Sequence, residues 1–296
     1  MRNNEDINLR HTFVGMLFAL AIGQAAILFG DLFRVVVYGW DFQISANGFI
    51  QTVKSGDYLI AAPIGHLLLG VVLVALSWVG WSQSKAGATY RKIKDVFSTA
   101  FLLLIIEVIL VIQYFILINS VEIDIKSFMI SKELNSAIPS VSAAPEATIM
   151  LVIFSTYALW DIISDVFLGR ITKKNMPCNK IYILPDFITI LTGIITYSGV
   201  SIICVVIAWY IQGLAVTPSN PISVFYTDIA LIALLFFFRA AKVLEKILKF
   251  IFPWEKKRTW EKNNIEARDT GRESPFRPVL MMLISLVIML FFTCKI

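Results

Sequence analysis

The sequence predicts an all-α polytopic membrane protein with about seven transmembrane helices, arranged N-in/C-out. The first observation is composition. Of 296 residues, 57% are hydrophobic and 16% are charged, whereas soluble domains average roughly 45–50% apolar and about 25% charged residues. The second is that the apolar residues form long runs rather than the roughly ten-residue alternating segments of a membrane β-barrel. The third is the distribution of lysine and arginine between the runs.

Seven apolar runs are expected to form the helices, because roughly 20 residues of helix cross a hydrocarbon core of about 30 Å. We divide the chain into two transmembrane modules. Residues 1–170 hold helices one to four with an exterior loop at 119–146, and residues 171–296 hold helices five to seven with a charged cytosolic loop at 249–277. The seven runs are residues 12–40, 58–82, 96–118, 147–169, 183–213, 222–248 and 279–293.

The basic residues give the orientation. Segments that alternate along the chain carry twenty lysines and arginines on one side of the membrane and four on the other. Cytosolic loops carry the excess of these residues. The sequence therefore predicts a cytosolic N-terminus and a multi-pass protein of the cell inner (plasma) membrane.

Ionisable residues inside the spans are the first candidates for function, because each costs about 2.5–3.5 kcal/mol at the centre of a membrane helix. Asp161 and Asp165 lie one turn apart on the fourth span, and Glu107 lies near the middle of the third. Two neighbouring carboxylates repel each other and favour a cationic partner. Arg239 of the sixth span has a compatible depth. We leave open whether Asp161 and Asp165 line an ion path or form structural pairs with Arg239.

Polar residues of the first two spans lie toward the outer side. Gln24 and Asp31 are seven residues apart and share a face, which predicts either the wall of a water-filled path or a polar seam between helices. Asp31 can also pair with Arg34, three residues later. We expect His66, in the outer third of the second span, to be an interfacial side chain bonded to a neighbour.

A ridge of small residues follows another face of the first span. Such ridges let two helix backbones approach closely in a membrane. The packing partner is either another helix of this chain or a second copy of it. The ridge consists of Gly15, Ala19, Gly23, Ala26 and Gly30.

The sixth span continues into an amphipathic segment and then a charged loop. Lysines and apolar residues alternate at helical spacing from residue 240 to Pro253, which suits the cytosolic interface. The loop beyond is basic and is expected to bind either anionic lipid headgroups or a cytosolic protein or anionic ligand. Its candidate contacts are Lys256, Lys257, Arg258 and Lys262.

Sequence motifs give no sign of an enzyme. The chain has no GxxxxGK, HExxH, GxSxG or CxxC motif, and its three cysteines are scattered. We therefore expect no catalytic residues, no cofactor, no metal site and no direct nucleic-acid contact. The lipid bilayer and further copies of the chain are the expected partners.

Three segments carry a resemblance to a known group of proteins. FALAIGQ at 18–24, the segment 77–84 that closes the second span, and Trp160 with Asp161 resemble the small multi-helix membrane subunits of bacterial anti-phage defence systems. The resemblance covers at most the first four spans. It implies an oligomeric membrane effector that perturbs ion gradients under the control of a cytosolic partner.

The leading hypothesis is an oligomeric membrane protein that forms or gates an ion-conducting path, lined by acids of spans one, three and four. Intramembrane acids outnumber intramembrane bases, which favours cations. One alternative is a non-conducting scaffold or sensor that recruits a soluble partner through loop 249–277. Another is a secondary transporter, in which spans one to three and four to six would form an inverted repeat.

Overall fold

The protein is a bundle of long helices. The computed structural model describes residues 5–38, 61–85, 99–133, 142–167, 187–215, 221–251 and 276–294, and these residues contain seven helices and no strand. The predicted fold class is thereby confirmed. The helices are α1 (Glu5–Tyr38), α3 (Ala61–Lys85), α4 (Thr99–Glu133), α5 (Ala144–Phe167), α7 (Phe187–Ala215), α8 (Pro221–Ile251) and α10 (Phe276–Thr293).

Six of these helices are long and apolar enough to cross a membrane, and the apolar part of α10, Pro278–Thr293, is shorter. Inside a bilayer a helix satisfies all its backbone hydrogen bonds internally, which explains why these sequences adopt it. These helices therefore indicate a multi-span membrane protein in contact with lipid.

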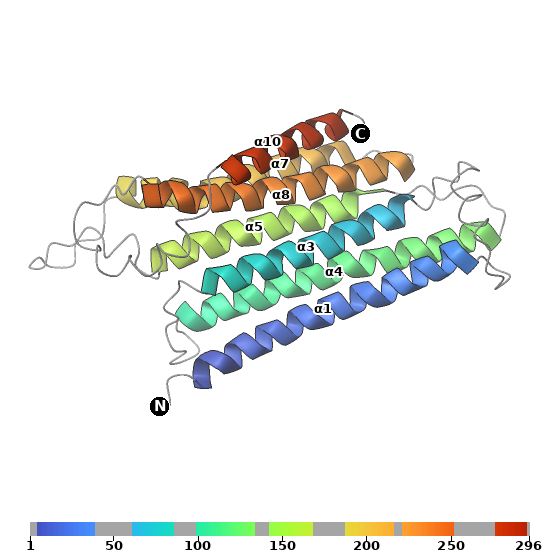
Figure 1. The fold of residues 1–296 in the computed structure, drawn as a ribbon, viewed down its shortest axis with the longest axis horizontal. Helices are drawn as coiled ribbons and strands as arrows, with labels where there is room; N and C mark the ends of the chain where they lie inside the picture. The colour runs from blue at the N-terminus through green and yellow to red at the C-terminus, as the bar shows by residue number, and fades with distance from the viewer. Residues whose placement is uncertain are drawn as a thin grey trace, which may run out of the picture.

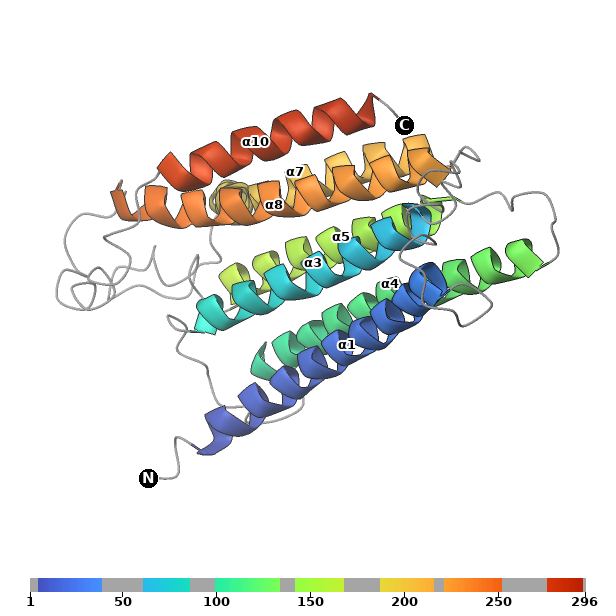
Figure 2. The same ribbon diagram turned by 45° about the vertical axis from the view of Figure 1, so that its right-hand side comes forward.

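The helices lie side by side with their axes along the long dimension of the molecule (Figure 1). In both views α1 and α4 form one side, α3 and α5 the middle, and α7 and α8 the next layer, with α10 outermost (Figure 2). The N- and C-termini lie at opposite ends of the bundle. This arrangement agrees with an odd number of crossings. The end that holds the N-terminus is called the inner end here, after the orientation that the basic residues predict.

The third helix is longer than the sequence analysis expected. We placed its end at residue 118 and assigned 119–146 to an exterior loop, but α4 continues to Glu133 and α5 already begins at Ala144. Val121 and Ile125 are buried, so the packed face of α4 continues past the first polar residues. The polar residues in this stretch occupy other faces of the same helix. Asp124 and Glu146 therefore belong to helices of the bundle.

Aromatic contacts connect the layers. Phe18 of α1 meets Trp78 of α3 and Tyr114 of α4, with ring centroids 5.3 and 5.9 Å apart. Tyr157 of α5 stacks on Phe238 of α8 at 5.2 Å. Packing of this kind is a main source of helix association in a bilayer, since lipid removes the hydrophobic drive.

The small-residue ridge of α1 packs inside the chain only at its beginning. A methyl group placed on Gly15 would lie 3.6 Å from the ring of Trp78, whereas one on Gly23 or Gly30 would meet nothing within 4 Å. Ala19 and Ala26 are exposed as well. Of the two alternatives for the ridge, packing within the chain therefore applies to Gly15, and packing of Gly23 and Gly30 against another copy stays a prediction.

The continuation of the sixth span is helical, as expected, because α8 extends to Ile251. The loop residues Lys256, Lys257, Arg258 and Lys262 lie outside the part of the chain that the structure describes. Their expected role in lipid or partner binding stays a prediction.

Labelling of cysteines tests the orientation. Cys294 is exposed at the C-terminal end of α10, whereas Cys204 is completely buried in α7. We expect a membrane-impermeant maleimide to label Cys294 on cells with an intact plasma membrane and to leave Cys204 unlabelled. The loss of labelling in Cys294→Ser is the control. Labelling of Cys294 only after cell lysis would show that the orientation is reversed.

Candidate functional site

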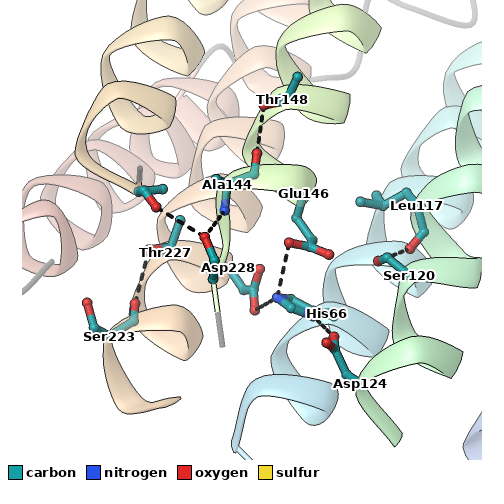
Figure 3. A network of polar contacts seen from close by, with 12 residues as sticks. His66, Leu117, Ser120, Asp124, Ala144, Glu146, Thr148, Ser223, Thr227 and Asp228 are labelled. Atoms are coloured by element: carbon teal, nitrogen blue, oxygen red, sulfur yellow. Dashed lines mark hydrogen bonds and ion pairs between the residues drawn. The ribbon is translucent and has the colours of Figure 1, made fainter. Parts of the chain in front are cut away.

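A histidine surrounded by three carboxylates lies inside the outer half of the bundle. His66 comes from the second turn of α3, Asp124 from α4, Glu146 from the first turn of α5 and Asp228 from the second turn of α8 (Figure 3). We call these four residues the His66 cluster. Each belongs to a different helix, so the cluster exists only when α3, α4, α5 and α8 are packed together.

Both nitrogens of the imidazole face acids. Asp124 contacts Nδ1. On the other side of the ring, Nε2 lies 3.4 Å from Asp228 Oδ2 and 3.6 Å from Glu146 Oε2. Figure 3 shows the ring between these groups, with Asp124 on one side and Asp228 and Glu146 on the other.

The cluster is withdrawn from its surroundings. The side chains of His66 and Asp228 are 0% exposed, that of Glu146 is 3% exposed, and only Asp124, at 20%, reaches the surface. No hydrogen-bond partner among the described residues reaches His66 Nε2, Glu146 Oε2 or either carboxylate oxygen of Asp228. Burying a charge without a partner is costly, so this concentration of polar atoms requires a compensating cation or proton.

Local structure explains why Glu146 points inward. Ser142 precedes α5, and its Oγ accepts a hydrogen bond from the backbone N–H of Ala144, 3.2 Å away, as a helix cap does. The same hydroxyl donates to the backbone carbonyl of Ala215 at the end of α7. The cap fixes the first turn of α5 against α7. An acid in a first turn is also favoured by the helix dipole.

A close approach of α3 to α8 makes room for Asp228. A methyl group on Gly65 would collide with the carboxylate of Asp228 and lie 3.1 Å from the ring of Phe225. Glycine is therefore required next to His66 for steric reasons. It lets the carboxylate lie against the backbone of α3, directly beside the imidazole.

The donor set of the cluster matches that of metal sites. His66, Asp124 and Glu146 each offer one ligand atom, and these atoms all lie within 4.8 Å of one another. Imidazole nitrogen and carboxylate oxygen are common ligands of divalent metal ions in proteins. This arrangement departs from the sequence analysis, which expected no metal site. The residues are far apart in the sequence, and no spacing motif connects them.

A second cluster of polar side chains lies in the inner half of the bundle. Asp161 of α5 accepts a hydrogen bond from Ser201 Oγ of α7 and forms an ion pair with Lys242 of α8, with 2.7 Å between Nζ and Oδ2. The sequence analysis had placed Lys242 with the cytosolic residues and had named Arg239 as the partner. The guanidinium of Arg239 lies against α3, since a methyl group on Gly80 would come within 2.5 Å of it.

Hydroxyl groups connect α3, α4 and α5 near the middle of the bundle. Tyr157 OH lies 2.7 Å from Ser77 Oγ and 2.6 Å from Tyr114 OH. At the positions directly before Tyr114 and Tyr157, Gln113 Nε2 donates to Thr156 Oγ1 at 3.0 Å. These hydrogen bonds join α3, α4 and α5.

An apolar layer separates the hydroxyl groups from the His66 cluster. On each of the four helices, the face that points into the bundle carries completely buried apolar side chains between the cluster and the hydroxyl level. They include Leu69 and Leu73 on α3, Leu117 and Ile118 on α4, Ile153 and Phe154 on α5, and Leu231 and Leu234 on α8. These side chains pack against one another in the core of the bundle.

The other predicted site residues have separate environments. Glu107 is buried in α4, as a mid-membrane acid should be, whereas Asp31 and Arg34 are exposed on the surface of α1. Gln24 donates to Asn119 Oδ1 of α4 at 3.3 Å, which makes it part of a polar seam between helices. Asp165 belongs to α5, but its side chain lies outside the description.

Sequence reasoning missed the cluster because it treated its members one by one. His66 was expected at an interface, Asp124 and Glu146 in a loop, and Asp228 at the mouth of a span. The signal available in the sequence was the four-residue spacing of apolar residues from Leu117 through Val121 to Ile125. All three are buried on α4. That spacing extends the helix across the polar residues and places Asp124 beside the outer parts of α3 and α5.

Comparison with known proteins adds no assignment. No protein-family model matches the sequence, and neither a curated protein nor a solved structure shows a significant match.

The steric role of Gly65 can be measured. Gly65→Ala should lower the free energy of unfolding by about 1–3 kcal/mol, because the added methyl group overpacks the contact with Asp228. Gly213→Ala is the matched control, since its methyl group would meet nothing within 4 Å. Thermal unfolding in detergent gives the comparison. Equal stability of the two variants would contradict the close approach of α3 and α8.

Proposed function

We propose that the protein moves cations across the membrane through the interior of its helix bundle, with the His66 cluster as the cation site. The observation that carries the proposal is the burial of Asp228 and Glu146 against a single imidazole. Ionisable groups facing the interior of a membrane bundle mark ion pathways and proton relays.

The charges of the cluster favour a cation over an anion. Three carboxyl groups face one histidine, so the cluster holds more acidic groups than one imidazole can balance. A structural ion pair would balance one acid with one base. The excess of acid at a completely buried position supports a site that receives its positive charge from outside the chain.

A route through the membrane is supported by polar groups at two further levels. The hydroxyls around Tyr157 lie between the cluster and the Asp161–Lys242 pair along the helices. Helices α5 and α8 each contribute to both the outer and the inner group. For an ion to pass, these helices would have to move apart at the apolar layer. In this proposal the structure corresponds to the closed state of a gated path or of a transporter.

Association of copies and control by a partner belong to the proposal as well. The exposed ridge around Gly23 and Gly30 is a surface on which two α1 helices can approach closely in lipid. Control by a cytosolic partner, as in a membrane effector of antiviral defence, would act through loop 249–277. The proposed path lies within one chain and requires neither.

Reconstitution in liposomes tests the function. We expect purified protein to give a flux of at least one of H⁺, Na⁺, K⁺ and Mn²⁺ under an imposed gradient, and Asp228→Asn to abolish it because the site loses a charge. Asp161→Asn should alter the same flux. Glu122→Gln is the matched control, since Glu122 is an exposed acid of α4 that pairs with Lys126 on the surface.

Two results would contradict the proposal. One is the absence of flux for every cation in liposomes that contain folded protein. The other is an unchanged flux in Asp228→Asn. Either result would favour the non-conducting scaffold, for which deletion of loop 249–277 should abolish capture of a soluble partner.

A further inference from the structure

Unsatisfied atoms of the His66 cluster lie around one nitrogen of the imidazole. His66 Nε2, Glu146 Oε2 and Asp228 Oδ2 are buried and lack hydrogen-bond partners among the described residues. The two oxygens lie 3.6 and 3.4 Å from Nε2. A proton placed on one of these atoms satisfies one contact and leaves the others unmet. A metal ion satisfies all of them at once.

The separations from the imidazole nitrogen to the two acids fit such an ion. A Zn²⁺ ion binds imidazole nitrogen and carboxylate oxygen at about 2.0–2.2 Å, so two ligands of a tetrahedral site lie about 3.4 Å apart. The distances from Nε2 to Asp228 and to Glu146 are 3.4 and 3.6 Å. Three protein ligands leave the fourth position of a tetrahedron open, as in sites that exchange their ligand or their ion.

We infer that the His66 cluster binds a divalent transition-metal ion such as Zn²⁺ or Mn²⁺ through His66 Nε2, Glu146 and Asp228. This inference rests on the proposed function, since it names the class of cation that the site takes. Mg²⁺ and Ca²⁺ prefer shells made only of oxygen. An imidazole combined with carboxylates favours first-row transition metals.

Asp124 acts as a positioning residue in this site. Its carboxylate contacts Nδ1, the ring nitrogen that faces away from Glu146 and Asp228. In most metal sites the second nitrogen of a ligating histidine donates its proton to a carboxylate or carbonyl, which fixes the tautomer and the orientation of the ring. With Nδ1 protonated, Nε2 presents its lone pair to the ion.

Charge balance agrees with a divalent ion. As metal ligands, Glu146 and Asp228, both nearly or completely inaccessible, would be carboxylates with two negative charges, which a divalent ion cancels while the imidazole stays neutral. The remaining negative charge belongs to Asp124, the member of the cluster with 20% of its side chain exposed. A monovalent ion would leave a net charge among the buried ligands.

Titration with Co²⁺ tests the inference on the purified full-length protein in detergent. We expect one Co²⁺ per chain, seen by its visible absorption and displaced by Zn²⁺. His66→Gln and Asp228→Asn should lose this binding, and Asp124→Asn should weaken it by about 10–100-fold because the ring is no longer held. Glu122→Gln should bind like the wild type.

A second measurement does not depend on the folding of variants. X-ray absorption by Zn²⁺ bound to the wild type should show a shell of nitrogen and oxygen with one imidazole and without sulfur. A wild type that binds no Co²⁺, a bound Zn²⁺ with sulfur ligands, or undiminished binding in both His66→Gln and Asp228→Asn would overturn the inference.

Failure of this inference and failure of the proposed function give different results. Flux of H⁺, Na⁺ or K⁺ without Co²⁺ binding would remove the metal site and keep cation transport. Binding of Co²⁺ that is lost in the variants, without flux of any cation, would keep the metal site and remove transport.

Discussion

Electrostatic compensation inside an apolar bundle is the constraint on which the structure depends. His66 and Asp228 are completely buried, and Glu146 nearly so, among helices whose remaining interior side chains are mostly hydrocarbon. Their charges can be balanced only by one another, by a proton or by an ion, because their side chains are closed off from the surface of the bundle. The four helices that supply them, α3, α4, α5 and α8, must therefore assemble in one register. Gly65 makes that register sterically accessible by admitting Asp228 against α3.

The same constraint gives the inner half of the bundle a different solution. Asp161 is matched within the chain by Lys242 and Ser201, so it needs no ion from outside. The outer cluster has three acids and one histidine and is not matched in this way. A bundle with a self-compensated group at one end, an under-compensated group at the other and a packed apolar layer between them is the arrangement expected of a closed cation path.

Sequence patterns predicted the helices well because hydropathy reports directly on the solvent that each segment faces. The end of α4 was wrong because polar residues were taken as the end of the helix, while Val121 and Ile125 continue its packed face. The cluster could not be predicted, since its four residues come from four helices and meet only through tertiary packing. A polar seam was one of two alternatives for Gln24, and its partner Asn119 had been assigned to a loop. The pairing of Asp161 with Lys242 depends on the helical continuation of α8, along which a lysine near the interface reaches inward.

Anomalous X-ray scattering from crystals of the protein grown with Mn²⁺ tests the central claim most directly, because it locates the ion without substituting any residue. The account predicts one anomalous peak per chain within bonding distance of His66 Nε2 and of the carboxylates of Glu146 and Asp228. Crystals that contain the ordered cluster but show no peak there, or whose Mn²⁺ binds only at other positions, would contradict it.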